Sequence, residues 1–224
     1  GVHLDAETRT LLVCDTGNRR LQALHLDIDP QAEAGFDREM PRFLRMVDFE
    51  RFGRTILDLE LEWTIEPIAV TRDEAGAVYV LDGRNERVFV FNEQLRPQRS
   101  FGALSAPTSL VATDGKVFVV DSRGVQVFTA AGDALHSFGA DALHTPHGIV
   151  LGPDGTLYVS DVAAHRLVHF DKSGNELGVI GQRGIERPGD TDHSPREPAR
   201  GCRSGVARRE EERPGHQEMP AAGQ

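Results

Sequence analysis

One short polar stretch of the sequence brings together residue types that could do chemistry. Asp15, Asn18 and Arg20 stand close together between two apolar runs, in LLVCDTGNRRLQAL at 11–24. A carboxylate can serve as a general base, and an arginine can stabilise developing negative charge. Whether these residues act in this way depends on the elements that position them and on whether the combination occurs only once.

A second combination, Ser160, Asp161 and His165, holds the residue types of a nucleophile, an acid and a base. Ser160 and Asp161 are adjacent in LYVSD, whose alternation predicts a strand. Neighbouring residues of a strand point to opposite faces, so we do not expect these two side chains to converge in a triad. The sequence also contains no G-x-S-x-G, Walker A, G-x-G-x-x-G or H-E-x-x-H motif.

The first stretch belongs to a repeat in which an alternating apolar strand ends at an aspartate and a polar turn leads into a second strand. The aspartates of the four copies are Asp15, Asp82, Asp121 and Asp161, the last three being 39 and 40 residues apart. A further apolar run precedes each hairpin, at 1–4, 66–70, 106–111 and 145–150, with a proline in the last three. A fourth strand is predicted at 96–102, 133–139 and 175–181. Four short strands in about 40 residues is the period of a β-propeller blade.

These units resemble NHL repeats. The stretch PHGIVLGPDGTLYVSDVAAHRLVHFDKSGNELGVIG, 146–181, follows the family pattern of Pro-x-Gly-Ile-Ala-Val, an Asp-Gly turn and Tyr-Val-x-Asp almost throughout, and 67–91 is nearly as close. The resemblance implies an all-β fold, a β-propeller of four-stranded antiparallel blades over 1–181. Because the family closes with about six blades, we expect this chain to be a partial propeller, a fragment of a six-bladed parent.

The repetition predicts a structural role for the aspartate and the arginine, because a catalytic residue is usually needed once. The aspartate can accept hydrogen bonds from turn amides, and the arginine can lie beside it. In the third copy two turn residues are missing, so no arginine aligns with Arg20, Arg87 and Arg166.

Residues 28–65 interrupt the series, with 28–60 as an insertion or a degenerate blade, because the first two aspartates of the repeat are 67 residues apart. We favour an insertion on one face, with LDLELEW at 57–63 as the outer strand of the first blade. The alternative is a degenerate blade around Asp48. The aromatic residues of this segment would form either a binding surface or a small core of their own; they are Phe43, Phe49, Phe52 and Trp63.

Net charge and composition argue against several classes of function for this protein. The formal net charge is −10, and 182–224 contains eight arginines and eight acidic residues, so the whole excess lies in 1–181. Such a body disfavours nucleic acid as a partner. The segment 182–224 has almost nothing to bury and is predicted to be a disordered polar tail. No apolar run is long enough for a membrane helix. Cys14 and Cys202 form neither a disulfide framework nor a metal-ligand spacing, and Cys14 is expected to be a buried thiol.

The family also includes an enzymatic possibility. Peptidyl-α-hydroxyglycine amidating lyases have similar propellers and hold a catalytic zinc with histidines from the inner strands. His147 stands at such a position, but Ile68 and Thr108 occupy the matching places, and the first copy begins after its equivalent. The lyases also carry a turn tyrosine that 82–87 lacks. One histidine does not make a three-ligand site, so we predict neither a metal nor another cofactor.

The sequence therefore predicts a non-catalytic scaffold that binds a protein or a small ligand on the loop face of the propeller. The candidate binding residues lie in turns or at the channel mouth, where the copies differ; they are Arg84, Asn85, Arg123 and His147. Two alternatives stay open: a zinc-dependent enzyme resembling the amidating lyases, and an RNA-binding NHL domain.

Overall fold

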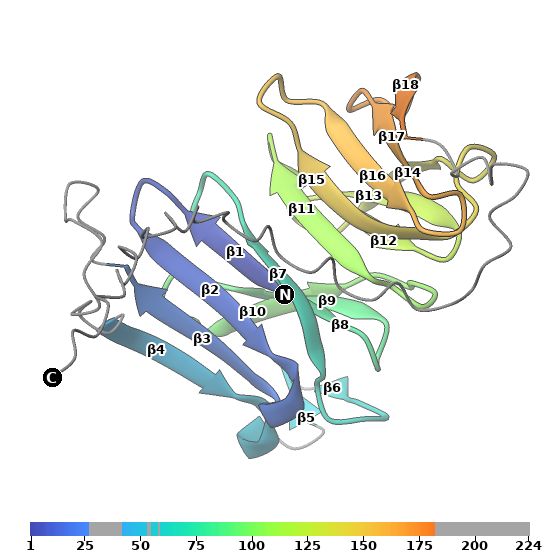
Figure 1. Cartoon of the computed structure of the whole chain (residues 1–224). Helices are drawn as coiled ribbons and strands as arrows, with labels where there is room; N and C mark the ends of the chain where they lie inside the picture. The colour runs from blue at the N-terminus through green and yellow to red at the C-terminus, as the bar shows by residue number, and fades with distance from the viewer. Residues whose placement is uncertain (27–41, 53–54, 58, 182–224) are drawn as a thin grey trace, which may run out of the picture. The chain divides into compact units, whose positions relative to one another are not determined.

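The computed structural model describes residues 1–26, 42–52, 55–57 and 59–181, which form strands and tight turns in one compact unit (Figure 1). The predicted tail, 182–224, lies outside the described residues, as does 27–41 of the interruption. No helix in the described part of the chain is long and apolar enough to cross a membrane.

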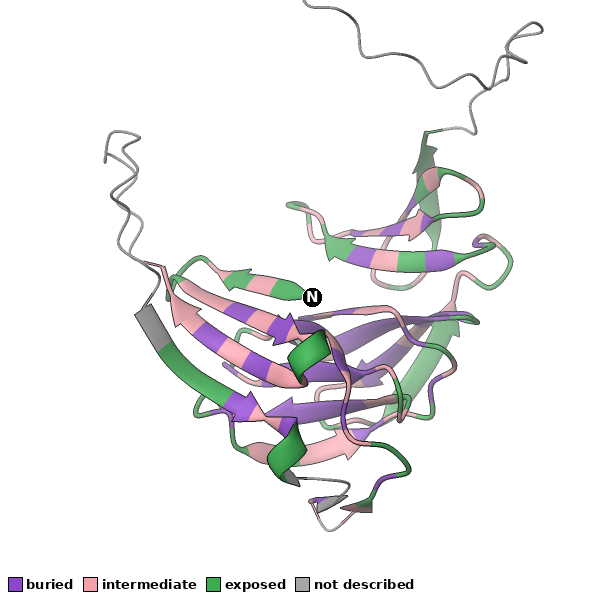
Figure 2. Ribbon diagram, turned by 60° about the horizontal axis from the view of Figure 1, so that its bottom comes forward, coloured by how far each residue is buried: buried purple, intermediate pink, exposed green. Residues whose placement is uncertain are grey.

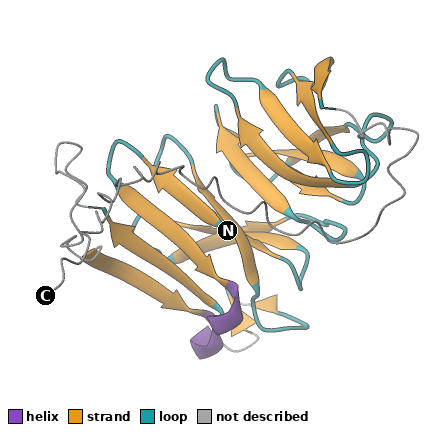
Figure 3. Ribbon diagram, viewed as in Figure 1, coloured by secondary structure: helices purple, strands orange, loops and turns teal. Residues whose placement is uncertain are grey.

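Four antiparallel sheets of four strands follow one another along the chain, as Figure 3 shows. The first contains β1 (Val2–Asp5), β2 (Thr10–Asp15), β3 (Arg20–His25) and β4 (Arg42–Asp48). The second contains β7 (Pro67–Arg72), β8 (Val78–Asp82), β9 (Arg87–Phe91) and β10 (Pro97–Phe101). The third contains β11 (Ser109–Thr113), β12 (Lys116–Asp121), β13 (Gly124–Thr129) and β14 (Ala134–Phe138). The fourth contains β15 (Pro146–Leu151), β16 (Leu157–Asp161), β17 (Arg166–Phe170) and β18 (Glu176–Ile180). These are the predicted propeller blades, numbered 1 to 4 here.

Turn chemistry fixes the register of each hairpin. In blade 3, Asp121 pairs with Gly124 across the β12–β13 turn, so only Ser122 and Arg123 connect the strands. Gly124 has a φ of +122°, a conformation that residues with a side chain rarely adopt. The shortened third copy is therefore a two-residue hairpin, and the strand pairing continues without slippage up to the turn.

The outer strand of blade 1 differs from the expectation. It is β4, which pairs with β3 from Arg20↔Asp48 to His25↔Arg42, and not the segment 57–63. Residues around 57–63 instead contribute to a two-stranded hairpin of β5 (Thr55–Ile56) and β6 (Leu59–Glu60). The described residues contain no degenerate blade around Asp48, because Asp48 ends β4 and is followed by a short 3₁₀ turn, η2 (Phe49–Phe52). The physical reason is length: β4 offers seven residues to β3, whereas β6 offers two.

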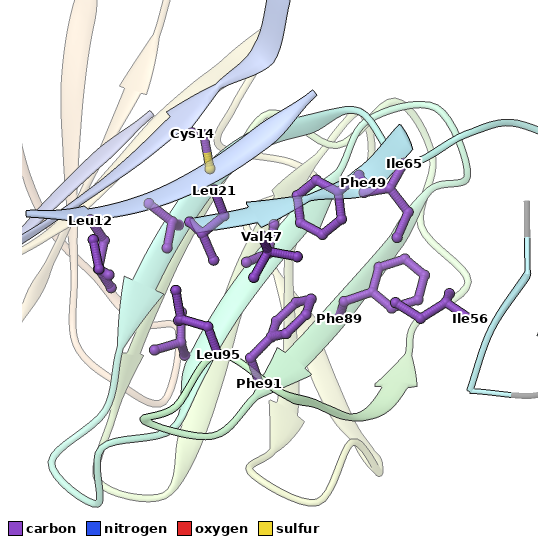
Figure 4. Packing of buried hydrophobic residues seen from close by; sticks show 14 of the residues in the cluster. Leu12, Cys14, Leu21, Val47, Phe49, Ile56, Ile65, Phe89, Phe91 and Leu95 are labelled. Carbon is purple, nitrogen blue, oxygen red and sulfur yellow. The ribbon is translucent and has the colours of Figure 1, made fainter. Parts of the chain in front are cut away.

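Apolar side chains fill the space between consecutive blades in three clusters. The first lies between blades 1 and 2 and includes Leu21, Phe89 and Phe91 (Figure 4). Phe49 and Ile65 from the interruption also pack here, so Phe49 does not belong to a separate small core. The side chains of Phe43 and Phe52 lie outside the described set. The other clusters join blades 2 and 3, around Tyr79 and Val119, and blades 3 and 4, around Phe118 and Phe170.

Burial alternates along the strands of blade 1, as Figure 2 shows, whereas every residue of β8 is buried because blade 2 is covered on both faces. Blades 1 and 4 each have one covered face. Their other faces expose large apolar side chains, among them Val2, Leu4 and Met46 on blade 1 and Leu167 and Ile180 on blade 4.

Candidate functional site

Each blade has an end at which the second strand closes on an aspartate, termed here the aspartate end and defined by Asp15, Asp82, Asp121 and Asp161. In blades 2 to 4 this side chain is buried, with at most 1% of the residue exposed. It accepts a backbone N–H from the segment that leads into the inner strand of the same blade. The donors are Glu66 to Asp82 (3.1 Å), Ser105 to Asp121 (3.2 Å) and Thr145 to Asp161 (3.0 Å). In blades 2 to 4 the aspartate therefore fastens the incoming chain to the blade, which is a structural role.

The surroundings of these carboxylates give them different acidities. Burial pushes the pKa of Asp161 upward, but the N–H groups of Thr145 and His144 and the Arg166 guanidinium bring the pKa down to about 2. For Asp82 burial prevails and raises the pKa, although Asn85 and backbone N–H groups oppose it. No arginine donates a hydrogen bond to Asp82 among the described contacts, which agrees with this difference in direction.

The predicted pairing of arginine with aspartate is confirmed in blades 1 and 4. Arg20 Nη2 lies 2.6 Å from Asp15 Oδ2, and Arg166 Nε lies 3.4 Å from Asp161 Oδ2. In blade 2 the prediction is wrong, because Arg87 donates to Ser100 Oγ at 3.2 Å.

Blade 3 does have an arginine for its aspartate, although none aligns in the sequence. Arg123 Nη2 lies 2.7 Å from Asp121 Oδ2 and donates to the carbonyl of Ala103 at 2.9 Å. In blade 4 the same two tasks fall to Arg166, which donates to Ala142 O at 2.6 Å. The two-residue turn thus brings a different sequence position to the same place.

The expected separation of Ser160 from Asp161 is confirmed. Ser160 Oγ accepts the N–H of Gly148 at 2.8 Å, while Asp161 is engaged with the incoming chain. His165 lies in the turn with a φ of +52°. The three residue types therefore do not form a triad.

Two of the four candidate binding residues are brought together around Trp63. Asn85 Oδ1 accepts the Trp63 N–H at 3.0 Å, and Asn85 Nδ2 donates to the Trp63 carbonyl at 2.9 Å. Arg84 lies over the indole, with Cζ 4.8 Å from the ring centroid, and its Nε is 3.5 Å from Glu66 Oε2. Trp63 is 45% exposed. The sequence marks Trp63 only as an aromatic residue of the interruption. The signal for its contact with the turn is its distance from Pro67, which matches that of Ala103 and Ala142 from their prolines.

The other two candidates belong to different blades. The side chain of Arg123 is 53% exposed although it caps Ala103 and pairs with Asp121. His147 is exposed at the second position of β15, and its carbonyl accepts the Thr108 hydroxyl at 2.6 Å. All four candidates lie at the aspartate end, but only Arg84 and Asn85 share a contact partner.

The inner strands β1, β7, β11 and β15 line an open groove of about 790 Å³. The arginine of this groove is already engaged, because Arg72 pairs with Asp5 at 2.7 Å and with Glu93 at 2.9 Å. Burial lowers the pKa of His3, which lies at the same groove. On β15 the lining runs over 148–151, so His147 lies just outside it.

A zinc site of the lyase type does not fit the residues that the structure describes. Ile68 and Thr108 provide no nitrogen ligand beside His147. In the described part of the chain no three His, Cys, Asp or Glu side chains lie close enough to hold a metal ion.

Comparisons with known proteins agree with the blade architecture. Residues 143–170 match the NHL repeat. Over 128 residues the chain is 28% identical to protein brain tumor of Drosophila melanogaster, covering 52% of this chain and 12% of that protein. Over 130 residues it is 32% identical to peptidyl-glycine alpha-amidating monooxygenase B of Xenopus laevis, covering 50% and 15%. The chain thus spans less than a sixth of either relative.

Solved structures show the same fold at low identity. The streptogramin B lyase structure superposes with a TM-score of 0.53 at 11% identity, over 79% of this chain and 52% of that one. A protein of unknown function from Bacteroides caccae gives a TM-score of 0.50 at 14% identity, over 78% and 58%. The described part of the chain thus forms four consecutive four-stranded antiparallel blades of the β-propeller kind, and the fourth contains a matched NHL repeat.

Proposed function

We propose that this chain is a non-catalytic binding scaffold that takes a protein or a small ligand at the aspartate end of its blades. One observation carries the proposal: the repeated carboxylates at this end, which could otherwise act in catalysis, are already hydrogen-bonded within the fold. Asp82, Asp121 and Asp161 are buried and bonded to the incoming backbone, whereas the side chains left exposed differ from blade to blade. Recognition needs such differences, and repeated scaffolds place them in loops.

The four candidate residues contribute in two ways. The side chains of Arg84 and His147 are exposed and bind no backbone carbonyl among the described contacts, so they would contact the ligand directly. Asn85 and Arg123 hold backbone carbonyls, of Trp63 and Ala103 respectively, so they would chiefly position the surface. Substituting the first pair changes recognition with little effect on the fold, while substituting the second pair affects both.

Selection of peptides from a random displayed library on the whole chain would test this function. Peptides selected on the chain are expected to lose affinity for the variants Arg84→Ala and His147→Ala. Arg96→Ala is the matched control, because Arg96 is exposed in the β9–β10 turn at the opposite end of blade 2. Selected peptides that bind both variants as tightly as the control would refute the location.

A lyase-like enzyme is the second candidate, and the 32% identity to the frog amidating monooxygenase is the observation that favours it. The donor set argues against it, since His147 stands alone at the inner-strand position. Zinc content measured on the purified chain separates the two: stoichiometric zinc that is lost in His147→Ala would favour the enzyme.

A further inference from the structure

Blade 2 has a tryptophan, Trp63, at a position where blades 3 and 4 have alanine. Ala103 and Ala142 stand four residues before Pro107 and Pro146, and the same place before Pro67 is occupied by Trp63. In all three blades the carbonyl of this residue accepts a side-chain hydrogen bond from a residue that lies in the turn after the aspartate or directly follows that turn. The donors are Asn85 to Trp63, Arg123 to Ala103 and Arg166 to Ala142.

The change of donor in blade 2 leaves an arginine available for another contact. Because Asn85 caps the Trp63 carbonyl, Arg84 is not needed there and lies over the indole instead. Asn85 also accepts the Trp63 N–H and donates to Asp82 Oδ2 at 2.6 Å, so both backbone polar groups of Trp63 are fixed to the blade. The backbone of Trp63 is therefore held in place, and Arg84 lies over one face of the indole, while Trp63 remains 45% exposed. A backbone that is already ordered lowers the entropy that this residue loses on binding.

The charges near Trp63 indicate which group the open part of the indole fits. Glu60 and Glu62 are exposed and precede it closely in the sequence, and Glu66 lies beside Arg84. Three carboxylates thus accompany a single arginine. An anionic partner would face a negative excess, whereas a cation would be attracted by the carboxylates and by the face of the indole ring.

We propose that Trp63, Glu62 and Glu66 form a receptor for an arginine or lysine side chain in an extended basic segment of a partner protein. This deepens the proposed function and rests on it, since the receptor lies at the aspartate end. Trp63 supplies the ring surface that Arg84 does not cover, Glu62 and Glu66 supply more negative charge than Arg84 alone balances, and Asn85 fixes the backbone of Trp63. Tryptophan is also among the residue types that most often carry the energy of protein interfaces.

The test uses the fact that Trp63 is the only tryptophan of the chain, so its fluorescence reports this site alone. The probes are ten-residue peptides that alternate glycine with arginine, lysine or glutamate and contain no aromatic residue. The arginine and lysine peptides are expected to change the emission of the whole chain in a saturable way. The glutamate peptide is expected to leave it unchanged. A saturable response to the glutamate peptide instead, or no response to either basic peptide, would overturn the receptor.

Charge variants separate this site from the general negative charge of the chain. The double variant Glu62→Gln, Glu66→Gln should lower the affinity for the arginine peptide roughly tenfold. This corresponds to losing two charge-assisted contacts at a partly exposed site. Glu176 is an exposed glutamate at the start of β18 in blade 4. The control variant Glu176→Gln removes a carboxylate from another blade and should have little effect on the affinity for the peptide. If both variants lose the same peptide affinity for each carboxylate that is removed, the proposed site is refuted.

The outcome also distinguishes the inference from the function on which it rests. If displayed peptides depend on Arg84 and His147 but are not basic and do not alter Trp63 emission, the binding scaffold stands and the cation receptor is wrong. If no selected peptide depends on either residue, the proposed function itself fails.

Discussion

The buried aspartates should be the most sensitive polar positions of the fold, and Asp161 gives the sharpest test. Its carboxylate accepts the N–H groups of His144 at 3.1 Å and Thr145 at 3.0 Å, and Arg166 Nε lies 3.4 Å away. The variant Asp161→Ala removes every acceptor at once. Two backbone N–H groups that point at this buried carboxylate then lose their acceptor, at about 1–3 kcal/mol each where water does not replace it, and a guanidinium loses its counter-charge. We expect a loss of about 3–5 kcal/mol in the free energy of unfolding.

Asp15→Ala is the matched control, because Asp15 has the same place in blade 1 but receives chiefly side-chain donors, from Asn18, Arg20 and Gln22. Those donors return to water when the carboxylate is removed, so the cost should be clearly smaller. Urea unfolding of the whole chain, followed by far-ultraviolet circular dichroism, measures both. If Asp15→Ala costs as much as Asp161→Ala, buried N–H groups are not what makes these aspartates important.

The same carboxylate predicts a pH dependence. The pKa of Asp161 is about 2 in the folded chain, below the value of about 3.9 for a free aspartate. A lowered folded pKa adds stability above the unfolded pKa, and this contribution is lost as the pH falls from about 5 to 2. A shift of almost two units corresponds to about 2 kcal/mol. Asp161→Asn should lack this part of the acid dependence, and an unchanged stability difference between pH 5 and pH 2 would contradict the assignment.

Three further predictions concern the backbone, the thiol and the core. Gly124→Ala should destabilise the chain by about 2 kcal/mol or more, since φ is +122° and a Cβ would meet a carbonyl oxygen at 2.5 Å; Gly17→Ala, with open space around it, is the control in the same urea assay. Burial raises the pKa of Cys14 to about 12, so in a Cys202→Ser chain its reaction with Ellman's reagent at pH 8 should require unfolding, and rapid labelling of the folded chain would contradict this. Phe91→Ala should cost about 3–5 kcal/mol in thermal or urea unfolding, because Phe91 is fully buried between blades 1 and 2, and a loss below about 1 kcal/mol would show that this cluster is loosely packed.

Local patterns in the sequence were enough to predict most of the fold. Alternating apolar residues and polar turns placed the hairpins of all four blades, and the spacing of the aspartates gave the blade period. The outer strand of blade 1 was misplaced because residues 26–41 separate β3 from β4, so nothing local to 42–48 marks it as the partner of β3. Strand pairing across such a distance is decided by competition between segments for the same edge, which a single sequence does not display.

The candidate site was predicted less completely. Arg84 and Asn85 were identified because their turn differs between copies, but the reason for the difference, the Trp63 contact, joins segments about 20 residues apart. Arg87 was expected at Asp82 by alignment, yet geometry gives the equivalent task to Asn85. A position in an alignment does not determine which side chain reaches a given carbonyl.

The sequence by itself determined the repeated unit: the strands, the turns and the aspartate that closes each hairpin follow from side-chain alternation and turn chemistry within about 40 residues. The tertiary structure decided which donor satisfies each buried carboxylate and carbonyl, and which side chains were left exposed. The physical reason is that strand alternation and turn preference act between neighbours in the chain. Hydrogen-bond satisfaction of a buried group depends instead on whatever reaches it in space, from any part of the chain.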